Sequence, residues 1–342
     1  MMRYRLLGRS GLRVSELAYG VMNFGMKAWG TPDAGMCAEL YRTYRDAGGN
    51  FLDTANEVYA NGRSEEFLGK LVTGHREEVV IGSKYSLHVP GTQNANLAGN
   101  HRKSMMHSVE RSLKRLGTDY LDLLWMHGWD GITPVDEVMR GFEDLVRQGK
   151  VLHVGVSNTP AWVIAQANTL ADFRGWTPFV GLQVEYNLAE RDVEHELLPM
   201  ARSLGLGVLA YSPLASGILS GKYNKEVDVG QRRLDVSKIM KTVDQRSLAV
   251  TDALMRVAEE IGRPPSQVAL NWLRRQQGVI PLVGARTVTQ LQDNLGCLEF
   301  SIDDAHMMVL DQASAREQPY PQRFIAQTRA VTSGGYHDLI DY

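Results

Sequence analysis

The 342-residue sequence has very few cysteines and no long hydrophobic run. Its two cysteines, Cys37 and Cys297, fall in segments typical of two different helices, and no C-x-x-C pair is present. Two cysteines are too few for a disulfide framework, so a reducing cytoplasm is the expected compartment. No stretch of about 18 apolar residues occurs, which excludes a transmembrane helix.

An excess of one charge is also absent. The chain has 37 Lys and Arg against 39 Asp and Glu, a net charge of −2, and no run of five or more like charges. This balance favours neither a nucleic acid nor a membrane as partner, which leaves a small molecule. The arginines between Met1 and Val14 could be mistaken for part of a transit peptide, but Gly8-Arg9-Ser10-Gly11 between two apolar segments is typical of a hairpin turn.

Strand-like and helix-like segments alternate along the whole chain. Short apolar runs that are typical of strands occur at 17–20, 50–53, 79–84, 120–127, 151–157, 181–185, 207–211 and 278–282. Amphipathic segments that are typical of helices follow near 34–46, 64–72, 100–116, 134–148, 161–170, 193–204, 246–261 with 266–276, and 288–298. Eight such units predict an α/β fold, a closed (β/α)8 TIM barrel rather than an open sheet.

No linker rich in Ser, Gly or Pro divides the chain, so residues 1–342 are expected to form a single domain. Three additions to the barrel follow the seventh strand: a long loop at about 214–244, an extra helix at 303–315, and a tail at 318–342 without clear periodicity. Long excursions near a barrel mouth are candidate lids, and the tail is a possible lid over the substrate site. Candidate helix caps are Ser64, Thr159 before Pro160, and Thr287 with Gln290 at the N-termini, and Gly149, Gly205 and Gly262 at the C-termini.

Chemically active side chains stand where strands end. Asp53, Lys84 and His127 each close an apolar run, and Tyr59 follows the first of them by six residues. Taken one at a time, Asp53 is typical of a turn residue, Lys84 of a lysine whose ammonium reaches solvent, and His127 of a core histidine. Parallel strands, however, bring their carboxyl ends to one barrel mouth. There Asp53 could keep Lys84 charged, and the ammonium could help Tyr59 release its proton. His127 would orient the substrate oxygen, and the absence of a nucleophile favours reduction over hydrolysis.

A phosphate site is also indicated, although no G-x-G-x-x-G opens a βαβ unit and a Rossmann domain is not expected. Arg286 precedes Thr287, the expected first cap of a helix. A phosphate there would meet free backbone N–H groups, the positive end of the helix dipole and a guanidinium. From the residues alone, pairing of Arg286 with a carboxylate is equally consistent with this position.

Several motifs together resemble the aldo-keto reductase family. Gly8–Ser15 resembles the family's opening hairpin, and Phe51-Leu52-Asp53-Thr54-Ala55 with Tyr59, Gly62 and Arg63-Ser64-Glu65 resembles its first signature. Leu113–Gly117 with Asp119–Leu123 resembles the approach to the catalytic histidine, and Ser83-Lys84-Tyr85 supplies the lysine position. The resemblance runs from Leu6 to about Ala315 and implies that Asp53, Tyr59, Lys84 and His127 form the catalytic tetrad.

The resemblance also implies NADPH or NADP⁺ as cofactor, with NADH possible but weaker, bound across the barrel mouth. The matching positions are Ser157, Asn158 and Gln183 for the nicotinamide amide, Tyr211 for its ring, Ser212, Pro213, Leu214, Gly217, Gly221 and Lys222 for the pyrophosphate, and Gly284, Arg286, Gln290 and Asn294 for the adenosine and its 2′-phosphate. Asp293 stands where many relatives have Glu, which puts the adenosine contacts in question.

The substrate implied is an aldehyde or ketone. Positions where the family lines its pocket are Asn23, Phe24, Trp29, Tyr85 and Trp129, with Tyr320 from the tail. Their aromatic character favours an apolar carbonyl compound, although ordinary loop packing explains such residues equally well. Gly128-Trp129-Asp130 after the histidine departs from the commonest pattern. The sequence implies no particular oligomeric state.

Two other functions are consistent with parts of the pattern. Channel-associated members of the same family hold NADPH with slow turnover as redox-sensing subunits, and they retain the tetrad. A metal-dependent barrel hydrolase could use His127, Asp53 and Lys84, but such sites usually need several convergent ligands, and 17–20 carries none. NADPH-dependent carbonyl reduction is therefore the leading hypothesis.

Overall fold

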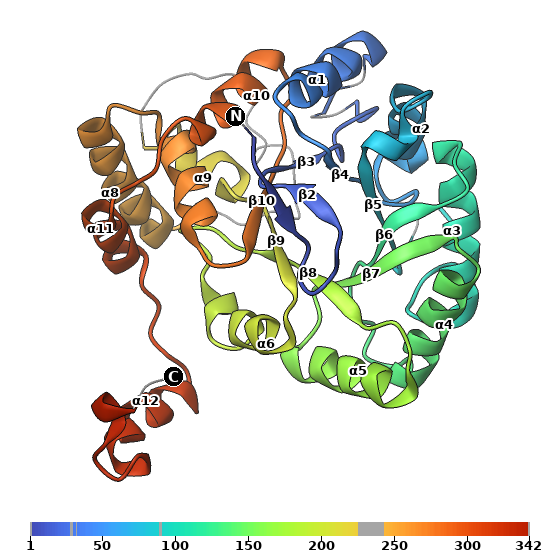
Figure 1. Cartoon of the computed structure of the whole chain (residues 1–342). Helices are drawn as coiled ribbons and strands as arrows, with labels where there is room; N and C mark the ends of the chain where they lie inside the picture. Colours follow the sequence, from blue (N-terminus) through green and yellow to red (C-terminus); the bar gives the residue numbers. More distant parts are fainter. Residues whose placement is uncertain (1, 28–29, 32, 89–90, 225–242, 341–342) are drawn as a thin grey trace.

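The computed structural model describes residues 2–27, 30–31, 33–88, 91–224 and 243–340. Eight parallel strands close into a barrel in the order β10-β3-β4-β5-β6-β7-β8-β9, and helices surround it (Figure 1). The strands are β3 (Ala18–Gly20), β4 (Phe51–Asp53), β5 (Val80–Tyr85), β6 (Leu121–Met126), β7 (Val151–Ser157), β8 (Phe179–Glu185), β9 (Gly207–Tyr211) and β10 (Val279–Val283). The predicted (β/α)8 TIM barrel is confirmed.

Apart from α12, the helices follow the predicted order. They are α1 (Ala34–Asp46), α2 (Arg63–Leu71), α3 (Arg102–Leu116), α4 (Val135–Arg147), α5 (Ala161–Arg174), α6 (Leu197–Leu204), α8 (Gln245–Ile261), α9 (Pro265–Arg275), α10 (Val288–Leu295), α11 (Asp304–Ser314) and α12 (Gln322–Thr332). Among the described residues, none of these helices combines the length and apolar character needed to cross a membrane.

The helix caps match the sequence in part. Thr287 caps α10 by accepting a bond from Gln290 N at 3.3 Å, and Gly205 and Gly262 end α6 and α8 in the left-handed conformation. The prediction for Ser64 was wrong, because α2 begins after Gly62 and the buried Ser64 hydroxyl donates to the Val21 carbonyl at 2.7 Å.

Thr159 was also predicted to be a cap. It stands one residue before Pro160, the N-cap of α5, and its hydroxyl donates to the Ser157 carbonyl at 2.9 Å. In both misassigned positions the hydroxyl donates to a carbonyl outside the helix and is therefore not available to a helix N–H group.

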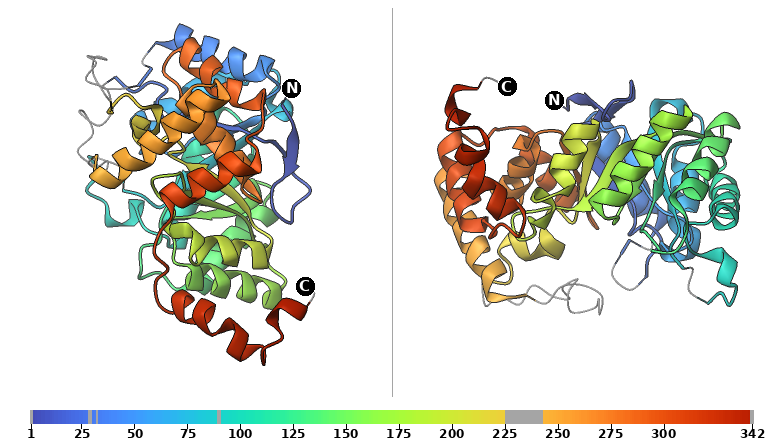
Figure 2. Two further views of the ribbon diagram at one scale, coloured as in Figure 1. Left: turned by 90° about the vertical axis from the view of Figure 1, so that its left-hand side faces the viewer. Right: turned by 90° about the horizontal axis from the view of Figure 1, so that it is seen from below.

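The N-terminal hairpin closes one end of the barrel. Its strands β1 (Tyr4–Leu6) and β2 (Arg13–Ser15) pair antiparallel, as predicted, and Figures 1 and 2 show them across the barrel's end. Leu7 and Val14, at the hairpin's inner face, are fully buried in the same cluster as inward-facing barrel residues. The hairpin therefore seals the interior from the end opposite the carboxyl ends of the strands.

A single indole fills the middle of the barrel. Trp125 on β6 is fully buried, and three neighbouring strands carry glycine where they face it. A Cβ atom would lie 2.4 Å from the indole at Gly155, 2.7 Å at Gly82 and 2.9 Å at Gly181, all closer than carbon atoms tolerate. The glycines are therefore required by the indole, which forms a packed floor beneath the strand ends.

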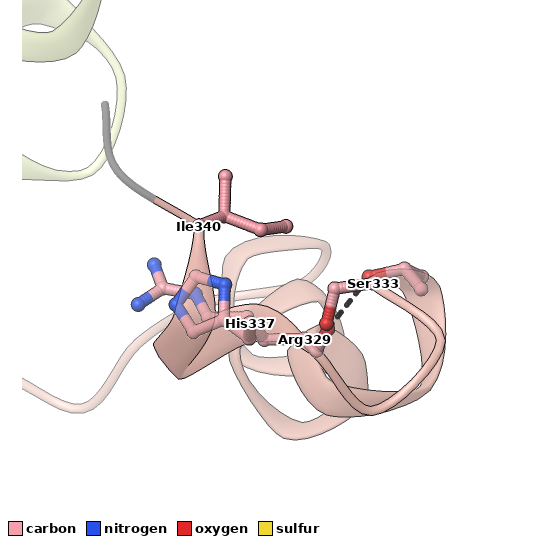
Figure 3. A pocket seen from close by; sticks show the side chains of 5 residues that line it. Arg329, Ser333, His337 and Ile340 are labelled. Carbon is pink, nitrogen blue, oxygen red and sulfur yellow. Dashed lines mark hydrogen bonds between the residues drawn. The ribbon is translucent and has the colours of Figure 1, made fainter.

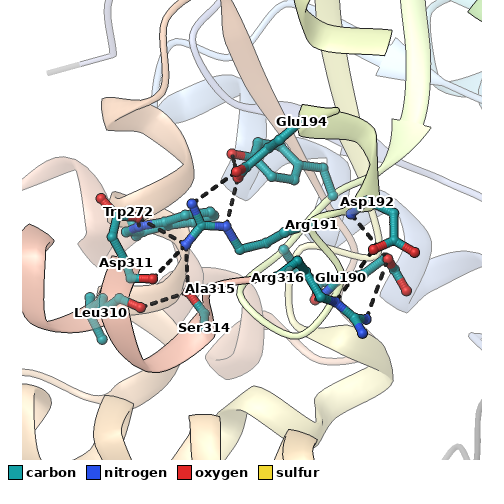
Figure 4. A network of polar contacts seen from close by, with 12 residues as sticks. Glu190, Arg191, Asp192, Glu194, Trp272, Leu310, Asp311, Ser314, Ala315 and Arg316 are labelled. Atoms are coloured by element: carbon teal, nitrogen blue, oxygen red, sulfur yellow. Dashed lines mark hydrogen bonds and ion pairs between the residues drawn. The ribbon is translucent and has the colours of Figure 1, made fainter. Parts of the chain in front are cut away.

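The loop after β8 is fastened to the C-terminal helices. Arg191 pairs with Glu194 at 2.7 Å and donates to Ser314 Oγ at 2.7 Å, and its guanidinium lies 5.2 Å from the centre of the Trp272 ring (Figure 4). Nearby, Arg316 pairs with carboxylates of the same loop. These contacts hold Ser314 and Arg316, which directly precede the tail, against the loop after β8.

The tail contains a helix that the sequence did not predict. In α12 no residue is buried, and Phe324, Ile325 and Val331 are all more than half exposed. Gln322 Nε2 donates to the His195 carbonyl at 3.3 Å, but Figures 1 and 2 show α12 outside the ring of helices rather than over the barrel mouth. A helix without a buried face leaves no hydrophobic period in the sequence.

A hollow in the tail is formed by tail residues alone. It is lined by Arg329, Thr332, Ser333, His337 and Ile340, and Ser333 Oγ donates to the Arg329 carbonyl at 2.9 Å (Figure 3). The sequence predicted the tail as a possible lid over the substrate site. Here its described residues form a hollow of their own, and α12 lies away from the barrel mouth.

Candidate active site

Three neighbouring strands bring the predicted catalytic residues together. Asp53 is the last residue of β4, Lys84 the penultimate residue of β5, and His127 follows β6 directly. The parallel register places Asp53 beside Gly82 and Lys84 beside Trp125. The carboxylate, amine and imidazole therefore share the end of the barrel opposite the hairpin.

Lys84 and Asp53 form a buried ion pair. Both are at most 2% exposed, and Lys84 Nζ contacts Asp53 Oδ2 and also donates to the Thr54 carbonyl at 2.7 Å. Gln183 Nε2 donates to the other oxygen, Asp53 Oδ1, at 2.9 Å. Burial by itself disfavours the ammonium, but Asp53 and then Tyr59 outweigh it and raise the pKa of Lys84 above its usual value. Lys84 is therefore a cation across the physiological pH range.

Tyr59 lies between this cation and the histidine. It stands in the loop between β4 and α2, with Lys84 Nζ 5.1 Å from the centre of its ring. The Tyr59 and His127 rings meet edge to face, with centroids 5.8 Å apart and planes at 89°. The structure thus gathers all four predicted catalytic side chains, and it sets the phenol against an ammonium that can stabilise its anion.

His127 is a neutral imidazole. Burial, with the charge of Lys84 as second cause, lowers its pKa to about 3. Within the described part of the chain, its Nδ1 atom has no hydrogen-bond partner. A neutral imidazole can donate or accept a hydrogen bond but is a poor source of protons at neutral pH. This leaves Tyr59 as the better proton donor.

The residues expected to hold the nicotinamide line the same mouth. Ser157 ends β7 with its hydroxyl buried and, among the described residues, unpartnered. Asn158 follows with φ +46°, and its Nδ2 donates to the His127 carbonyl at 2.9 Å while its Oδ1 accepts from the Tyr211 hydroxyl at 2.9 Å. Gln183 is turned toward Asp53 as described above. Two amides, two hydroxyls and an aromatic ring therefore lie close to the tetrad.

The segment after β9 has the backbone of a tight loop. Ser212 has φ +51°, and Gly217 and Gly221 have φ +94° and +77°, conformations that favour glycine. Pro213 and Leu214 lead into a 3-10 turn at Ala215–Ser220, and Lys222 Nζ lies against Gly217. Residues 225–242, most of the predicted long loop, fall outside the described part of the chain.

The predicted phosphate end is at the start of α10. Arg286 N donates to Gln290 Oε1 at 3.0 Å, so Gln290 completes the cap, and Asn294 Nδ2 contacts the Gly284 carbonyl at 3.4 Å. Asp293 is turned to α9, where it accepts from Ser266 Oγ at 2.7 Å. Arg286 thus stands at a capped helix N-terminus, as the sequence indicated.

The expected substrate residues are only partly at the mouth. Tyr85 is fully buried and packs edge to face on Phe142 of α4, because side chains alternate along a strand and its neighbour Lys84 points inward. Phe24 is fully buried against Tyr19. Neither ring lines the mouth, which corrects the expectation for both.

The remaining positions differ among themselves. Asn23 is buried and donates to the Ala285 carbonyl at 2.6 Å, Trp129 is half-buried, and Tyr320 is exposed on the tail. Trp29 lies outside the described residues. Trp129 is therefore the predicted substrate residue that the structure leaves accessible beside His127.

Sequence reasoning missed two kinds of residue at this site. One is the set of strained non-glycine residues in the loops after the strands: Ala60, Asn61, Ser86, Ala215 and Ser216 have positive φ, as do the predicted Asn158 and Ser212. The other is a group of buried charges behind Tyr59, described below. Strain of this kind clusters at functional sites but leaves no mark in composition.

Comparison with known proteins agrees with this arrangement. Residues 16–315 match the model of the "Aldo/keto reductase family". The chain is 36% identical over 333 residues to an aryl-alcohol dehydrogenase [NADP(+)] of Phanerodontia chrysosporium, covering 91% of this chain and 85% of that protein. It is 35% identical over 329 residues to a norsolorinic acid reductase of Emericella nidulans, covering 93% and 83%.

A putative aryl-alcohol dehydrogenase of Saccharomyces cerevisiae is 34% identical over 349 residues, covering 96% of this chain and 91% of that protein. The family match spans far more than half of the chain, and it includes all four side chains gathered at the mouth. The chain therefore belongs to the aldo/keto reductase family and is an oxidoreductase acting on carbonyl or alcohol groups.

Proposed function

We propose that this protein catalyses the reversible reduction of an aldehyde or ketone to the alcohol with NADPH, and that Tyr59 donates the proton. The observation that carries the proposal is the position of the Tyr59 phenol, with the Lys84 ammonium on one side and the neutral His127 imidazole on the other. NADPH, when bound, supplies the hydride that reduces the carbonyl carbon. The other steps fall to side chains of this chain.

The residues at the mouth fit a nicotinamide. Ser157 Oγ is a buried hydroxyl without a partner in the described part of the chain, and a carboxamide can satisfy such a group. Asn158 and Gln183 offer further amide contacts, and Tyr211 offers a ring face. The position of Arg286 at the N-terminus of α10 favours binding of NADPH over NADH, because a guanidinium and the positive end of the helix dipole both attract a 2′-phosphate.

The proton balance follows from the geometry. As the carbonyl oxygen gains negative charge, the O–H bond of Tyr59 breaks and its proton passes to that oxygen. Lys84 stabilises the phenolate that remains, and Asp53 keeps Lys84 charged. His127, being neutral, hydrogen-bonds the substrate oxygen without competing as an acid. In the direction of alcohol oxidation each proton transfer is reversed.

An aromatic carbonyl compound is the proposed substrate class. Two relatives are named for an aryl alcohol and for norsolorinic acid, and here Trp129 stands accessible beside His127. A cytoplasmic location is part of the proposal, since Cys37 and Cys297 are both free and buried.

The test is the loss of NADPH absorbance with a panel of aryl aldehydes and ketones. Tyr59→Phe keeps the ring and removes the proton, so kcat should fall by about 10²-fold or more. Undiminished turnover in this variant would exclude Tyr59 as the donor.

Arg286→Ala should weaken NADPH binding more than NADH binding, and equal weakening of both would refute the phosphate assignment.

A further inference from the structure

The loop that carries Tyr59 cannot hold its shape alone. Immediately after Tyr59, Ala60 and Asn61 have φ +53° and +56°, and Gly62 has φ +87°. Two consecutive non-glycine residues in the left-handed region are unfavourable, and they persist only where surrounding contacts fix them. The position of the Tyr59 phenol therefore depends on whatever fastens residues 54–62 to the rest of the barrel.

Helix α3 provides that fastening. Asn56 Nδ2 donates to Ser108 Oγ at 3.1 Å, and the Glu57 carboxylate, two residues before Tyr59, is 9% exposed. Glu57 Oε1 pairs with Arg115 Nη1 at 2.6 Å and also with Arg111 Nε. These ion pairs thus attach the loop to helix α3.

The same guanidinium holds the strand that carries Lys84. Arg115 Nε pairs with Glu65 Oε2 at 2.6 Å, and Glu65 Oε1 accepts from Ser83 Oγ at 2.6 Å. Glu65 is fully buried, and Ser83 directly precedes Lys84 on β5. One side chain therefore connects the loop bearing the phenol to the strand bearing the ammonium.

The backbone makes room for this connection. A Cβ atom at Gly62 would lie 2.7 Å from Arg115 Cδ, so glycine is needed both for its positive φ and for the passage of the arginine. The cluster is also balanced in charge, with Glu57 and Glu65 against Arg111 and Arg115. A planar fork that reaches two separate carboxylates from different nitrogens is specific to arginine, because a lysine presents one point charge.

We propose that Arg115 is a positioning residue for proton transfer: through Glu57 and Glu65 it fixes the separation between the Tyr59 phenol and the Lys84 ammonium. This rests on the proposed function of Tyr59 and Lys84. Arg115 itself contacts neither of them, and its effect is exerted through the loop and the strand.

Two variants weaken the connection and one controls for stability. Glu57→Gln keeps the shape of the side chain but removes its charge, and Arg115→Lys keeps the charge but loses the fork. Glu16→Gln is the matched control, because the Arg274–Glu16 pair is similarly buried, 15% and 4% exposed against 12% and 9%, and its partners, Arg274 of α9 and the Arg3 backbone before β1, lie outside both the Tyr59 loop and β5.

We expect Glu57→Gln to lower kcat by about 10- to 100-fold, since a displaced reacting group costs on this scale. KM for the carbonyl substrate and Kd for NADPH should stay within about twofold, because no binding group is changed. The pH profile of kcat should shift as well, with the acid that donates the proton titrating at higher pH. Arg115→Lys should show the same separation of kcat from KM.

Hydrogen exchange gives a readout that does not require activity. Peptides covering 54–62 should exchange faster in Glu57→Gln than in the wild type, and at the wild-type rate in Glu16→Gln, whose kcat should also be retained. The proposal is refuted if kcat in Glu57→Gln stays within about twofold of the wild type, or if Glu16→Gln loses as much. If the wild type reduces no carbonyl, the proposed function fails, and unchanged exchange in 54–62 refutes the fastening separately.

Discussion

Replacing Lys84 by Met isolates the electrostatic part of the site. Methionine keeps an unbranched side chain in the barrel and removes the charge that faces Tyr59. With Nζ 5.1 Å from the ring centre and an effective dielectric constant of about 20, 332/(20 × 5.1) gives about 3 kcal/mol of phenolate stabilisation. Asp53 cancels part of this attraction, whereas the phenolate charge lies mainly on the oxygen rather than at the ring centre, so the figure is an order of magnitude. Lys84→Met should therefore lower kcat by up to about 10²-fold.

The same substitution should also destabilise the fold. Asp53 is 2% exposed, and removing one partner of a buried ion pair costs about 3–5 kcal/mol, because the other charge is left uncompensated. Lys84→Met/Asp53→Asn removes both charges and should recover much of that stability. It should not recover kcat, because the cation beside Tyr59 is still missing.

The two effects are separated by measuring both variants in both assays. Urea unfolding gives the free energy of unfolding, and NADPH oxidation at saturating aryl aldehyde gives kcat. If the double variant regains kcat together with stability, the loss in Lys84→Met came from a damaged fold rather than from a missing charge. If Lys84→Met retains kcat within about threefold, the electrostatic argument itself is wrong.

Burial of neutral His127 should make the free energy of unfolding fall by up to about 1.4 kcal/mol per pH unit as the pH drops from 6.5 toward about 3. The reason is that the imidazole is protonated in the unfolded chain at a higher pH than in the native protein. Urea unfolding of the wild type and of His127→Gln across this pH range measures the effect. Gly155→Ala should cost about 1–3 kcal/mol through the clash with Trp125, whereas Gly11→Ala, with open space around it, should stay within about 0.5 kcal/mol. Truncation after Glu317 should leave unfolding unchanged to about 0.5 kcal/mol, since α12 buries no residue; a larger loss would show that the tail packs on the barrel.

The barrel could be predicted because its pattern is local and repeated. Each strand is a short apolar run, and each helix has a hydrophobic face, so β7 and β9 were predicted at their observed bounds. The strand-end rule also selected Asp53, Lys84 and His127, because parallel strands must present their carboxyl ends together. Tyr59 was selected because it follows Asp53 by six residues, and its contact with Lys84 depends on the loop between β4 and α2.

Side-chain contacts were predicted less well than the elements. Tyr85 was placed in the pocket because the family lines its pocket at this position, yet the alternation of a strand sends Tyr85 and Lys84 to opposite faces. Ser64 was assigned to a helix N-terminus because of its residue type, but its hydroxyl donates a hydrogen bond to the Val21 carbonyl. Gln183 was assigned to the cofactor and also bonds Asp53, a contact between residues 130 positions apart that no local pattern encodes.

The interior of the barrel explains why a costly ion pair can work at its mouth. A buried Lys–Asp pair is commonly less stabilising than apolar residues of the same volume, so its presence needs a functional reason. Below the pair, Trp125 and the hairpin residues Leu7 and Val14 are fully buried in one apolar cluster that fills this end of the barrel. In such surroundings a charge acts on a neighbouring phenol more strongly than it would in water. The three glycines that face Trp125 thus serve the chemistry as well as the packing, because they leave room for the indole to fill the barrel beneath Lys84 and Tyr59.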